Sequence, residues 1–163
     1  MEQNLPNFFD YPELALRQLE PSDIPFLVPI INEAYSYQDA AKGVKRTSIG
    51  HLTKRASEVE FYTLLKNDEI VGCVYLEPHG KELHFGLLTL VPELRGKNVG
   101  SSLMQAIESF AVATEFSSIG LDYMSLAPWL KRYYEKFGFS ETGKVTHWGE
   151  IDLIEMKKGL LLK

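Results

Sequence analysis

Residues 88–102 read LTLVPELRGKNVGSS, and this stretch joins a predicted strand to the start of a predicted helix. The apolar run at its beginning leads into a basic turn that contains Gly96 and Gly100. Free backbone N–H groups at a helix start, aligned with the helix dipole, can bind phosphate oxygens, and glycines allow close approach. Arg95 and Lys97 add positive charge. The stretch therefore predicts an anion site, although a plain helix entry with surface cations fits the local chemistry equally well.

Two common phosphate-binding motifs do not fit this turn. A P-loop ends in Gly-Lys-Ser/Thr, and a dinucleotide-binding turn has three glycines within six residues. The turn instead resembles the pyrophosphate-binding motif of the GNAT superfamily, Gln/Arg-x-x-Gly-x-Gly/Ala, with Arg95 and Gly100 at its outer positions. Asn98 stands where the middle glycine is usual, and Asn is among the few residues that tolerate a positive φ.

A second stretch, residues 127–139, reads APWLKRYYEKFGF and looks like the GNAT ending FYEKxGF. The two motifs occur in the order that the family requires, and the resemblance covers residues 14–156. It implies acetyl-coenzyme A as cosubstrate, with the strand backbone holding the pantetheine arm and the turn holding the phosphates. The cofactor residues assigned in this way are Leu88, Thr89, Leu90, Arg95, Gly96, Lys97, Asn98, Val99, Gly100 and Ser101. The sequence has no Cys/His cluster with metal-ligand spacing, so we expect no metal.

The resemblance also assigns a catalytic role to Tyr134, because in the family the tyrosine before Glu-Lys lies near the coenzyme sulfur. Acyl transfer expels a thiolate, and a phenol with a pKa of about 10 can donate a proton to that sulfur. Without the motif, Tyr134 and its neighbours Tyr133, Phe137 and Phe139 predict core packing beside a helix end. The family's frequent Asn, seven residues before the tyrosine, is Ala127 here, so one expected coenzyme contact is missing.

The attacking amine must lose a proton, so a base or a water chain is expected near the acceptor. Asp122 is the first candidate, because some GNAT members that acetylate protein N-termini have an acid twelve residues before the tyrosine. An acid on this predicted strand can also be satisfied by its neighbours or by solvent, without any catalytic role. Weaker candidates for the base are Glu33, Glu77, Glu82, His79 and His84.

The periodicity of apolar residues predicts a single mixed α+β domain over residues 1–163, with a largely antiparallel sheet and helices over its faces. Strands are expected within residues 13–20, 61–65, 70–76, 82–91, 118–124, 139–147 and 150–157. Helices are expected within residues 24–35, 49–57, 99–113 and 128–137. A loop is expected over residues 39–50, and turns at residues 78–80 and 148–149.

Composition narrows the range of partners. The formal net charge of -5 argues against nucleic-acid binding, which requires many Lys and Arg residues on one face. The longest apolar runs are far shorter than the roughly 20 residues that a membrane helix needs. The first residues have no basic cluster before an apolar segment, unlike a signal peptide. We therefore expect a cytoplasmic protein without membrane or nucleic-acid partners, in which the single Cys73 is buried.

These observations predict an N-acetyltransferase in which a bound amine attacks acetyl-coenzyme A directly, in a ternary complex. The acceptor stays open between a small-molecule amine and a peptide amine, and the negative charge agrees with cationic acceptors. The alternative is a noncatalytic sensor that binds acyl-coenzyme A, which the departures at Asn98 and Ala127 favour. A homodimer is an open possibility, because a terminal strand at residues 150–160 can pair within the subunit or between subunits.

Overall fold

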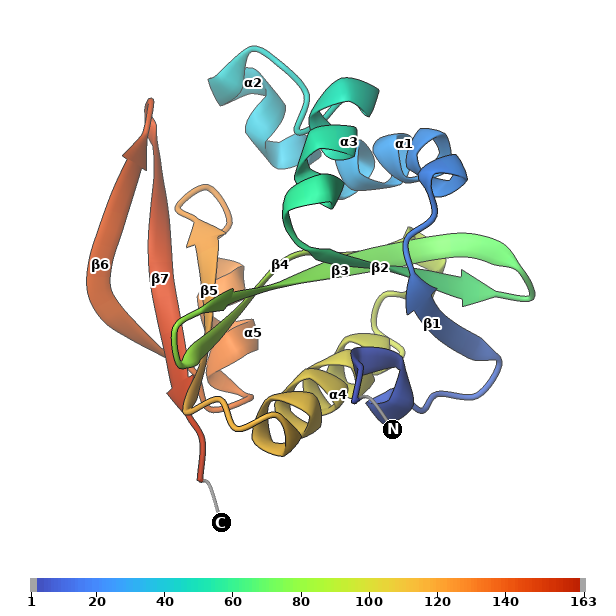
Figure 1. Ribbon diagram of the computed structural model, residues 1–163. Helices are drawn as coiled ribbons and strands as arrows, with labels where there is room; N and C mark the ends of the chain where they lie inside the picture. Colours follow the sequence, from blue (N-terminus) through green and yellow to red (C-terminus); the bar gives the residue numbers. More distant parts are fainter. Residues whose placement is uncertain (1–2, 162–163) are drawn as a thin grey trace.

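The fold is built on a sheet of seven strands in the order β1-β2-β3-β4-β5-β7-β6 (Figure 1). The structure is a computed structural model, which describes residues 3–161. The strands are β1 (Leu14–Gln18), β2 (Glu60–Lys66), β3 (Glu69–His79), β4 (Glu82–Leu90), β5 (Ser118–Met124), β6 (Ser140–Trp148) and β7 (Ile151–Gly159). Neighbouring strands are antiparallel, except that β4 and β5 are parallel. The predicted mixed α+β class is confirmed, while the ends of the predicted domain 1–163 lie outside the described residues.

Helices cover both faces of the sheet (Figure 1). One face carries α1 (Ile24–Ala34), α2 (Asp39–Lys42) and α3 (Ile49–Glu58), and the other carries α4 (Val99–Ala113) beside the 3₁₀ helix η1 (Leu5–Phe8). The α5 helix (Trp129–Glu135) lies beside β5, and three short 3₁₀ helices are η2 (Pro21–Asp23), η3 (Ser36–Gln38) and η4 (Pro92–Leu94). Among the described residues, no helix combines the length and the apolar character needed to cross a membrane.

Alternation along the strands sends side chains to two separate cores. In β2, Leu64 belongs to the cluster shared with α4, whereas Phe61 belongs to the cluster shared with α1 and α3. Full burial of a Leu or Phe side chain of this kind stabilises the fold by about 1.5–3 kcal/mol. Cys73 lies in the second cluster and is 1% exposed, so the predicted burial of this thiol is confirmed.

Three local predictions were wrong in detail. The expected loop over residues 39–50 begins with α2, because two alanines favour a helical turn that Gly43, at φ 72°, then ends. Pro78 lies within β3 instead of in the turn, because β2 pairs with β3 only as far as Leu76. Beyond that point the strand has a free edge, where a residue without an N–H is tolerated. Trp148 is the last residue of β6 and pairs with β7, so the turn of this hairpin lies one residue later than expected.

The short pairing of β4 with β5 creates the opening that positions the site. Residues 82–84 of β4 pair with residues 118–120 of β5, after which β4 continues beside β3 and β5 beside β7 (Figure 1). A bulge in β4, with Leu87 at φ 48°, bends the strand where the two part. The sheet is therefore open between the second half of β4 and the second half of β5.

Candidate active site

The opening leads into a cleft of about 620 Å³ that is bounded by three parts of the chain. The end of β4 and the turn before α4 form one part, α5 forms another, and the segment that follows α1 forms the third. The cleft is lined by Ala34, Tyr35, Tyr37, Leu88, Thr89, Leu90, Leu94, Arg95, Gly96, Asn98, Val99, Gly100, Ser101, Trp129, Leu130, Tyr133 and Tyr134. Nine of the ten predicted cofactor residues thus line one cleft together with Tyr134, and the tenth, Lys97, does not.

The turn before α4 presents free backbone donors to this cleft. Gly96 and Asn98 have left-handed φ angles of 75° and 64°, and Asn98 is the N-cap of the helix. Asn98 therefore adopts the positive φ that the sequence analysis assigned to it in place of a glycine. Within residues 3–161, the N–H groups of Val99, Gly100 and Ser101 have no hydrogen-bond acceptor. Together with the helix dipole, these donors suit an anion.

Residues from distant parts of the chain contact the two basic residues of the turn, Arg95 through its side chain and Lys97 through its backbone. Arg95 Nε donates to the carbonyl of Leu90 at 3.1 Å, and its guanidinium pairs with Glu33 of α1 at 2.5 and 3.3 Å. The carbonyl of Lys97 accepts a hydrogen bond from the Tyr11 hydroxyl at 2.7 Å. Glu33, a weaker candidate for the base, is thus the ion-pair partner of Arg95.

Tyr134 is buried in α5 and makes an edge contact with Phe85 of β4, the ring centroids being 6.0 Å apart. Burial raises the pKa of Tyr134 well above its ordinary value, and the neighbouring phenols of Tyr35 and Tyr133 raise it further. The phenol therefore keeps its proton at neutral pH and can act as a hydrogen-bond donor. Tyr134 lines the same cleft as the turn before α4.

Tyr133 also faces the cleft, where the sequence analysis expected core packing. Its hydroxyl oxygen lies beside Gly100, where a Cβ would come within 2.2 Å of it. Phe139, by contrast, is buried against Tyr134 as predicted, and Phe137 is partly buried on the same core. Tyr133 is also partly buried against this core, so the predicted packing holds for it while the same side chain lines the cleft.

Two further aromatic residues complete the cleft and were not anticipated. Tyr37 of η3 and Trp129 of α5 meet edge to face, with ring centroids 5.6 Å apart, and both line the cleft. Trp129 is 56% exposed, which is unusual for so large an apolar side chain. No local motif assigns a role to either residue. The only feature in the sequence that could have indicated Tyr37 is the pair of tyrosines at positions 35 and 37 in a polar segment.

Asp122 lies away from the cleft lining, on the side of β5 opposite to the buried Leu121 and Tyr123. Its side chain is 38% exposed, and its Oδ2 lies 3.6 Å from Nε2 of His84 in β4. Burial lowers the pKa of His84, and the negative charge of Asp122 opposes this in part. His84 belongs to the last β4–β5 pair, so the two residues stand at the edge of the opening.

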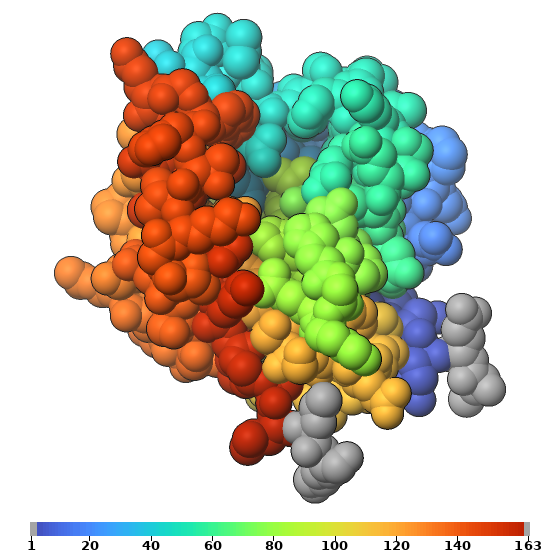
Figure 2. Space-filling view, turned by 60° about the vertical axis from the view of Figure 1, so that its left-hand side comes forward, coloured from blue at the N-terminus to red at the C-terminus, as the bar shows by residue number. Residues whose placement is uncertain are grey.

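This face of the sheet is open to solvent between the helices and the β6–β7 hairpin. Figure 2 shows the surface hollowed there, between the hairpin in orange and red and the strands β3 and β4 in green. The face carries further charged groups, among them Glu77, which pairs with Arg55 of α3 at 3.3 Å. The hollow lies on the far side of the opening from α4, so a second molecule can reach the opening from this side.

Three possible metal ligands come together on the same face, a grouping that the sequence analysis did not predict. Single ligand atoms of His79, Glu82 and His84 lie within 4.8 Å of one another. Two of these side chains already have partners, since His79 Nε2 lies 2.9 Å from Glu77 and Glu82 Oε1 lies 3.0 Å from Lys157 Nζ. The cluster is therefore a network of ion pairs and hydrogen bonds within the protein.

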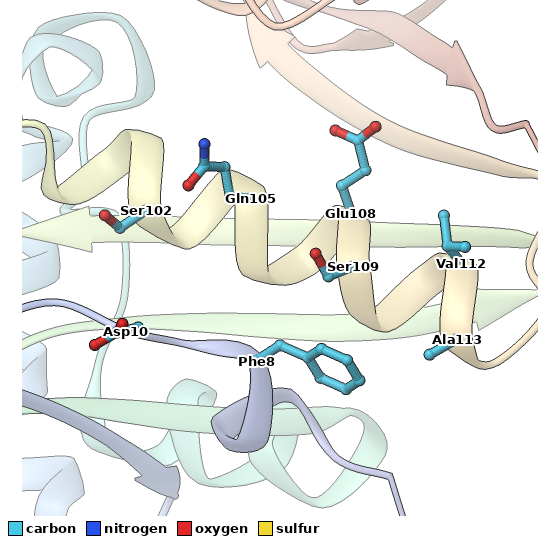
Figure 3. A pocket seen from close by; sticks show the side chains of 8 residues that line it. All are labelled: Phe8, Asp10, Ser102, Gln105, Glu108, Ser109, Val112 and Ala113. Carbon is cyan, nitrogen blue, oxygen red and sulfur yellow. The ribbon is translucent and has the colours of Figure 1, made fainter.

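A second cavity, of about 610 Å³, lies between η1 and α4 and has a different character. Its lining includes Phe8, Asp10, Gln105 and Glu108, but Figure 3 shows the carboxylate of Glu108 directed away from Asp10. Glu108 instead pairs with Lys158 at 2.9 Å. A binding site is expected to have polar groups that converge, so the cleft at the turn is the better candidate.

Several N-acetyltransferases of known structure share this fold. The ribosomal-protein-S18-alanine N-acetyltransferase from Escherichia coli has a TM-score of 0.73 at 15% identity, over 92% of this chain and 96% of its own. PaiA N-acetyltransferase from Thermoplasma acidophilum, solved with coenzyme A, has a TM-score of 0.71 at 17% identity, over 90% and 99%. Spermidine N-acetyltransferase from Vibrio cholerae, solved with CoA and spermine, has a TM-score of 0.68 at 18% identity, over 90% and 95%. At this identity the likeness establishes the fold.

The sequence itself establishes the family. The family described as acetyltransferase (GNAT) domain matches residues 31–160, which include the phosphate turn, the opening and α5. The chain belongs to the GNAT acetyltransferase family. No protein of curated function matches it in sequence.

Proposed function

We propose that this protein transfers the acetyl group of acetyl-coenzyme A to a primary amine, by direct attack within a ternary complex. The observation that carries the proposal is the single cleft in which the free N–H groups at the start of α4 face Tyr134. Because β4 and β5 part after His84, this cleft is accessible from the other face of the sheet as well. Acetyl-coenzyme A bound on one side of the sheet and the acceptor amine on the other can therefore meet at the opening.

The residues present fit coenzyme A. The N–H groups of Val99, Gly100 and Ser101 would hold its phosphates, with Asn98 keeping the turn in its left-handed conformation. Past its last pair with β5, β4 has a free edge, whose backbone groups at residues 88–90 would hold the pantetheine arm. The bound coenzyme would supply an acetyl thioester with a thiolate leaving group.

Tyr134 provides the proton for the departing sulfur. Its raised pKa keeps the phenol protonated at neutral pH, and no hydrogen-bond acceptor within the described residues engages its hydroxyl. The hydroxyl is therefore available to a ligand in the cleft. A positioned proton donor of this kind contributes about 10²–10⁴-fold to a rate.

The Asp122–His84 pair receives the proton of the attacking amine. Asp122 is the base that the family resemblance implied, and the neutral imidazole of His84 beside it can accept a proton directly. The pair stands at the edge of the opening on the open face of the sheet. The acceptor therefore approaches from the hollow between the helices and the β6–β7 hairpin (Figure 2).

The proposal is tested by calorimetric titration with acetyl-coenzyme A, followed by measurement of thiol release with a panel of amines. We expect binding with a micromolar dissociation constant and amine-dependent release of the free thiol. Binding without release for any amine would favour the noncatalytic sensor instead. Absence of binding would overturn the proposal altogether.

A further inference from the structure

Arg46 occupies an unusual position in the loop between α2 and α3. Its Nε is buried and has no hydrogen-bond partner among residues 3–161, and no carboxylate in that range forms an ion pair with it. The guanidinium carbon lies 5.4 Å from the ring centroid of Tyr35 and 5.6 Å from that of Trp148. A buried guanidinium N–H without an acceptor is costly, so the position calls for an anionic partner.

The loop that carries Arg46 is held in place on both sides of this residue. The buried Gln38 donates from Nε2 to the carbonyl of Val44 at 3.0 Å. Asn32 of α1 exchanges two hydrogen bonds with the backbone of Thr47, at 2.8 and 3.1 Å. The backbone on both sides of Arg46 is therefore fixed before any ligand arrives, as expected for the support of a binding residue.

Other charged groups near the open face already have partners. Arg55 pairs with Glu77 at 3.3 Å, and Lys157 pairs with Glu82 at 3.0 Å. The chain as a whole has a net charge of -5, so acids are in excess over bases. A fixed arginine without a carboxylate in such a protein points to a carboxylate supplied from outside.

The position of Arg46 connects it to the acceptor side of the cleft. Tyr35, against whose ring the guanidinium lies, lines the cleft together with Tyr37 and Tyr134. Trp148 is the last residue of β6, and Lys42 Nζ lies 3.6 Å from the centroid of its ring. Arg46 is not itself among the residues that line the cleft, but it contacts one of them, Tyr35, which belongs to the segment after α1.

We propose that Arg46 binds a carboxylate of the acceptor, so that the amine to be acetylated belongs to an amino acid or a similar compound with an acidic group. This inference rests on the proposed function. The planar guanidinium matches a carboxylate with two parallel hydrogen bonds, while the aromatic rings of Tyr35 and Trp148 cover its faces.

The test compares the common L-amino acids with their carboxamides as acceptors, in the wild type and in Arg46→Gln. The ratio of kcat/KM for acid and amide is calculated for each enzyme, so that the different basicity of the two amines cancels between enzymes. We expect Arg46→Gln to reduce this ratio by roughly 10- to 100-fold, chiefly through KM for the acid. Arg46→Lys, which keeps the charge but not the paired donors, should also lose much of the preference.

Lys45→Gln is the matched control, because Lys45 lies next to Arg46, is 70% exposed and loses the same charge. It should leave the ratio unchanged. Equal loss for acid and amide in Arg46→Gln, weaker binding of acetyl-coenzyme A in that variant, or exclusive use of amines without a carboxylate would overturn the inference. Acetylation only of amines without a carboxylate would leave the proposed function intact. Absence of acetyl-coenzyme A binding by the wild type would refute both the proposed function and the role of Arg46.

Discussion

The hydroxyl oxygen of Tyr133 fills the space beside the α-carbon of Gly100, where a Cβ would lie 2.2 Å from it. Gly100→Ala therefore forces the side chain of Tyr133 to shift, in addition to crowding the free N–H groups at the start of α4. We expect this variant to lose roughly 1–3 kcal/mol of stability, as overpacked sites do, and to bind acetyl-coenzyme A more weakly. Thermal unfolding and calorimetry measure the two effects separately.

The double variant Gly100→Ala/Tyr133→Phe serves as the control for this prediction. Without the hydroxyl, the nearest ring atom of residue 133 lies 3.5 Å from the new Cβ, an ordinary contact distance. Stability should therefore recover, whereas weak binding should persist if the phosphates need the space at residue 100. If Gly100→Ala were as stable as the wild type, this result would contradict the close contact between residue 100 and the Tyr133 hydroxyl.

Tyr134→Phe removes the proton donor but keeps the ring that packs against Phe85 and Phe139. We expect kcat to fall by about 10²-fold or more, with little change in stability or in affinity for acetyl-coenzyme A. Stopped-flow or steady-state thiol release, combined with calorimetry, distinguishes these quantities. An unchanged kcat would show that the thiolate leaves without help from this phenol.

The acid side of the pH profile reports on His84. Burial lowers its pKa below the ordinary 6.5, so kcat/KM should be constant down to that region and fall as the imidazole gains a proton. Asp122→Asn removes a charge that favours the protonated form, which lowers the pKa further and moves the fall to lower pH. A loss of kcat at every pH in Asp122→Asn would instead identify Asp122 as the group that takes the proton. If His84 takes the proton, His84→Gln should abolish the fall in kcat/KM at low pH. If Asp122 takes it, His84→Gln should leave that fall in place.

A separate prediction concerns stability in acid. Asp23 is buried and accepts hydrogen bonds from Arg17 at 2.7 and 2.9 Å and from Thr63 at 2.8 Å. Burial favours the neutral carboxyl, but these hydrogen bonds outweigh it and hold the pKa of Asp23 below its ordinary value. Its contribution to stability is therefore complete above the unfolded-state pKa of about 3.9 and is lost as pH falls through the folded-state pKa.

Asp23→Asn should cost about 2 kcal/mol at neutral pH, because it leaves the guanidinium of Arg17 without its partner. The difference from the wild type should shrink as the pH is lowered below 4, which urea denaturation at several pH values measures. A difference that is independent of pH would contradict the assignment. Acetyl-coenzyme A binding at neutral pH is the control and should be retained, because Asp23 lies outside the cleft.

The conformation of the turn before α4 could be predicted from the sequence because it is local. The left-handed residue at Asn98 and the start of α4 at Val99 both follow from the types of a few adjacent residues. The order of strands and helices was also readable, since the period of apolar residues changes from element to element. The catalytic role expected for Tyr134 needed the family motif as well, because local features of an aromatic residue near a helix end predict only core packing.

The acceptor side could not be predicted, because it depends on contacts between distant segments. The His84–Asp122 pair requires the parallel register of β4 and β5, and Arg46 meets Trp148 across about a hundred residues of sequence. Tyr37 and Trp129 likewise meet only in the folded chain. Side chains in such positions satisfy no local pattern, so Arg46, Tyr37 and Trp129 had no predicted role and His84 was a weaker candidate. Asp122 was the first candidate for the base only because of the family resemblance.

The hydrogen bond from Tyr11 to the carbonyl of Lys97 affects the choice of the N-terminal boundary for an expressed fragment. The region matched by the family begins at residue 31, and a clone trimmed to it would lack η1, β1 and this hydrogen bond. Phe8, which packs edge to face on Phe110 of α4, would be lost too. A shortened fragment would therefore lose the N-terminal support of α4 and of the turn before it.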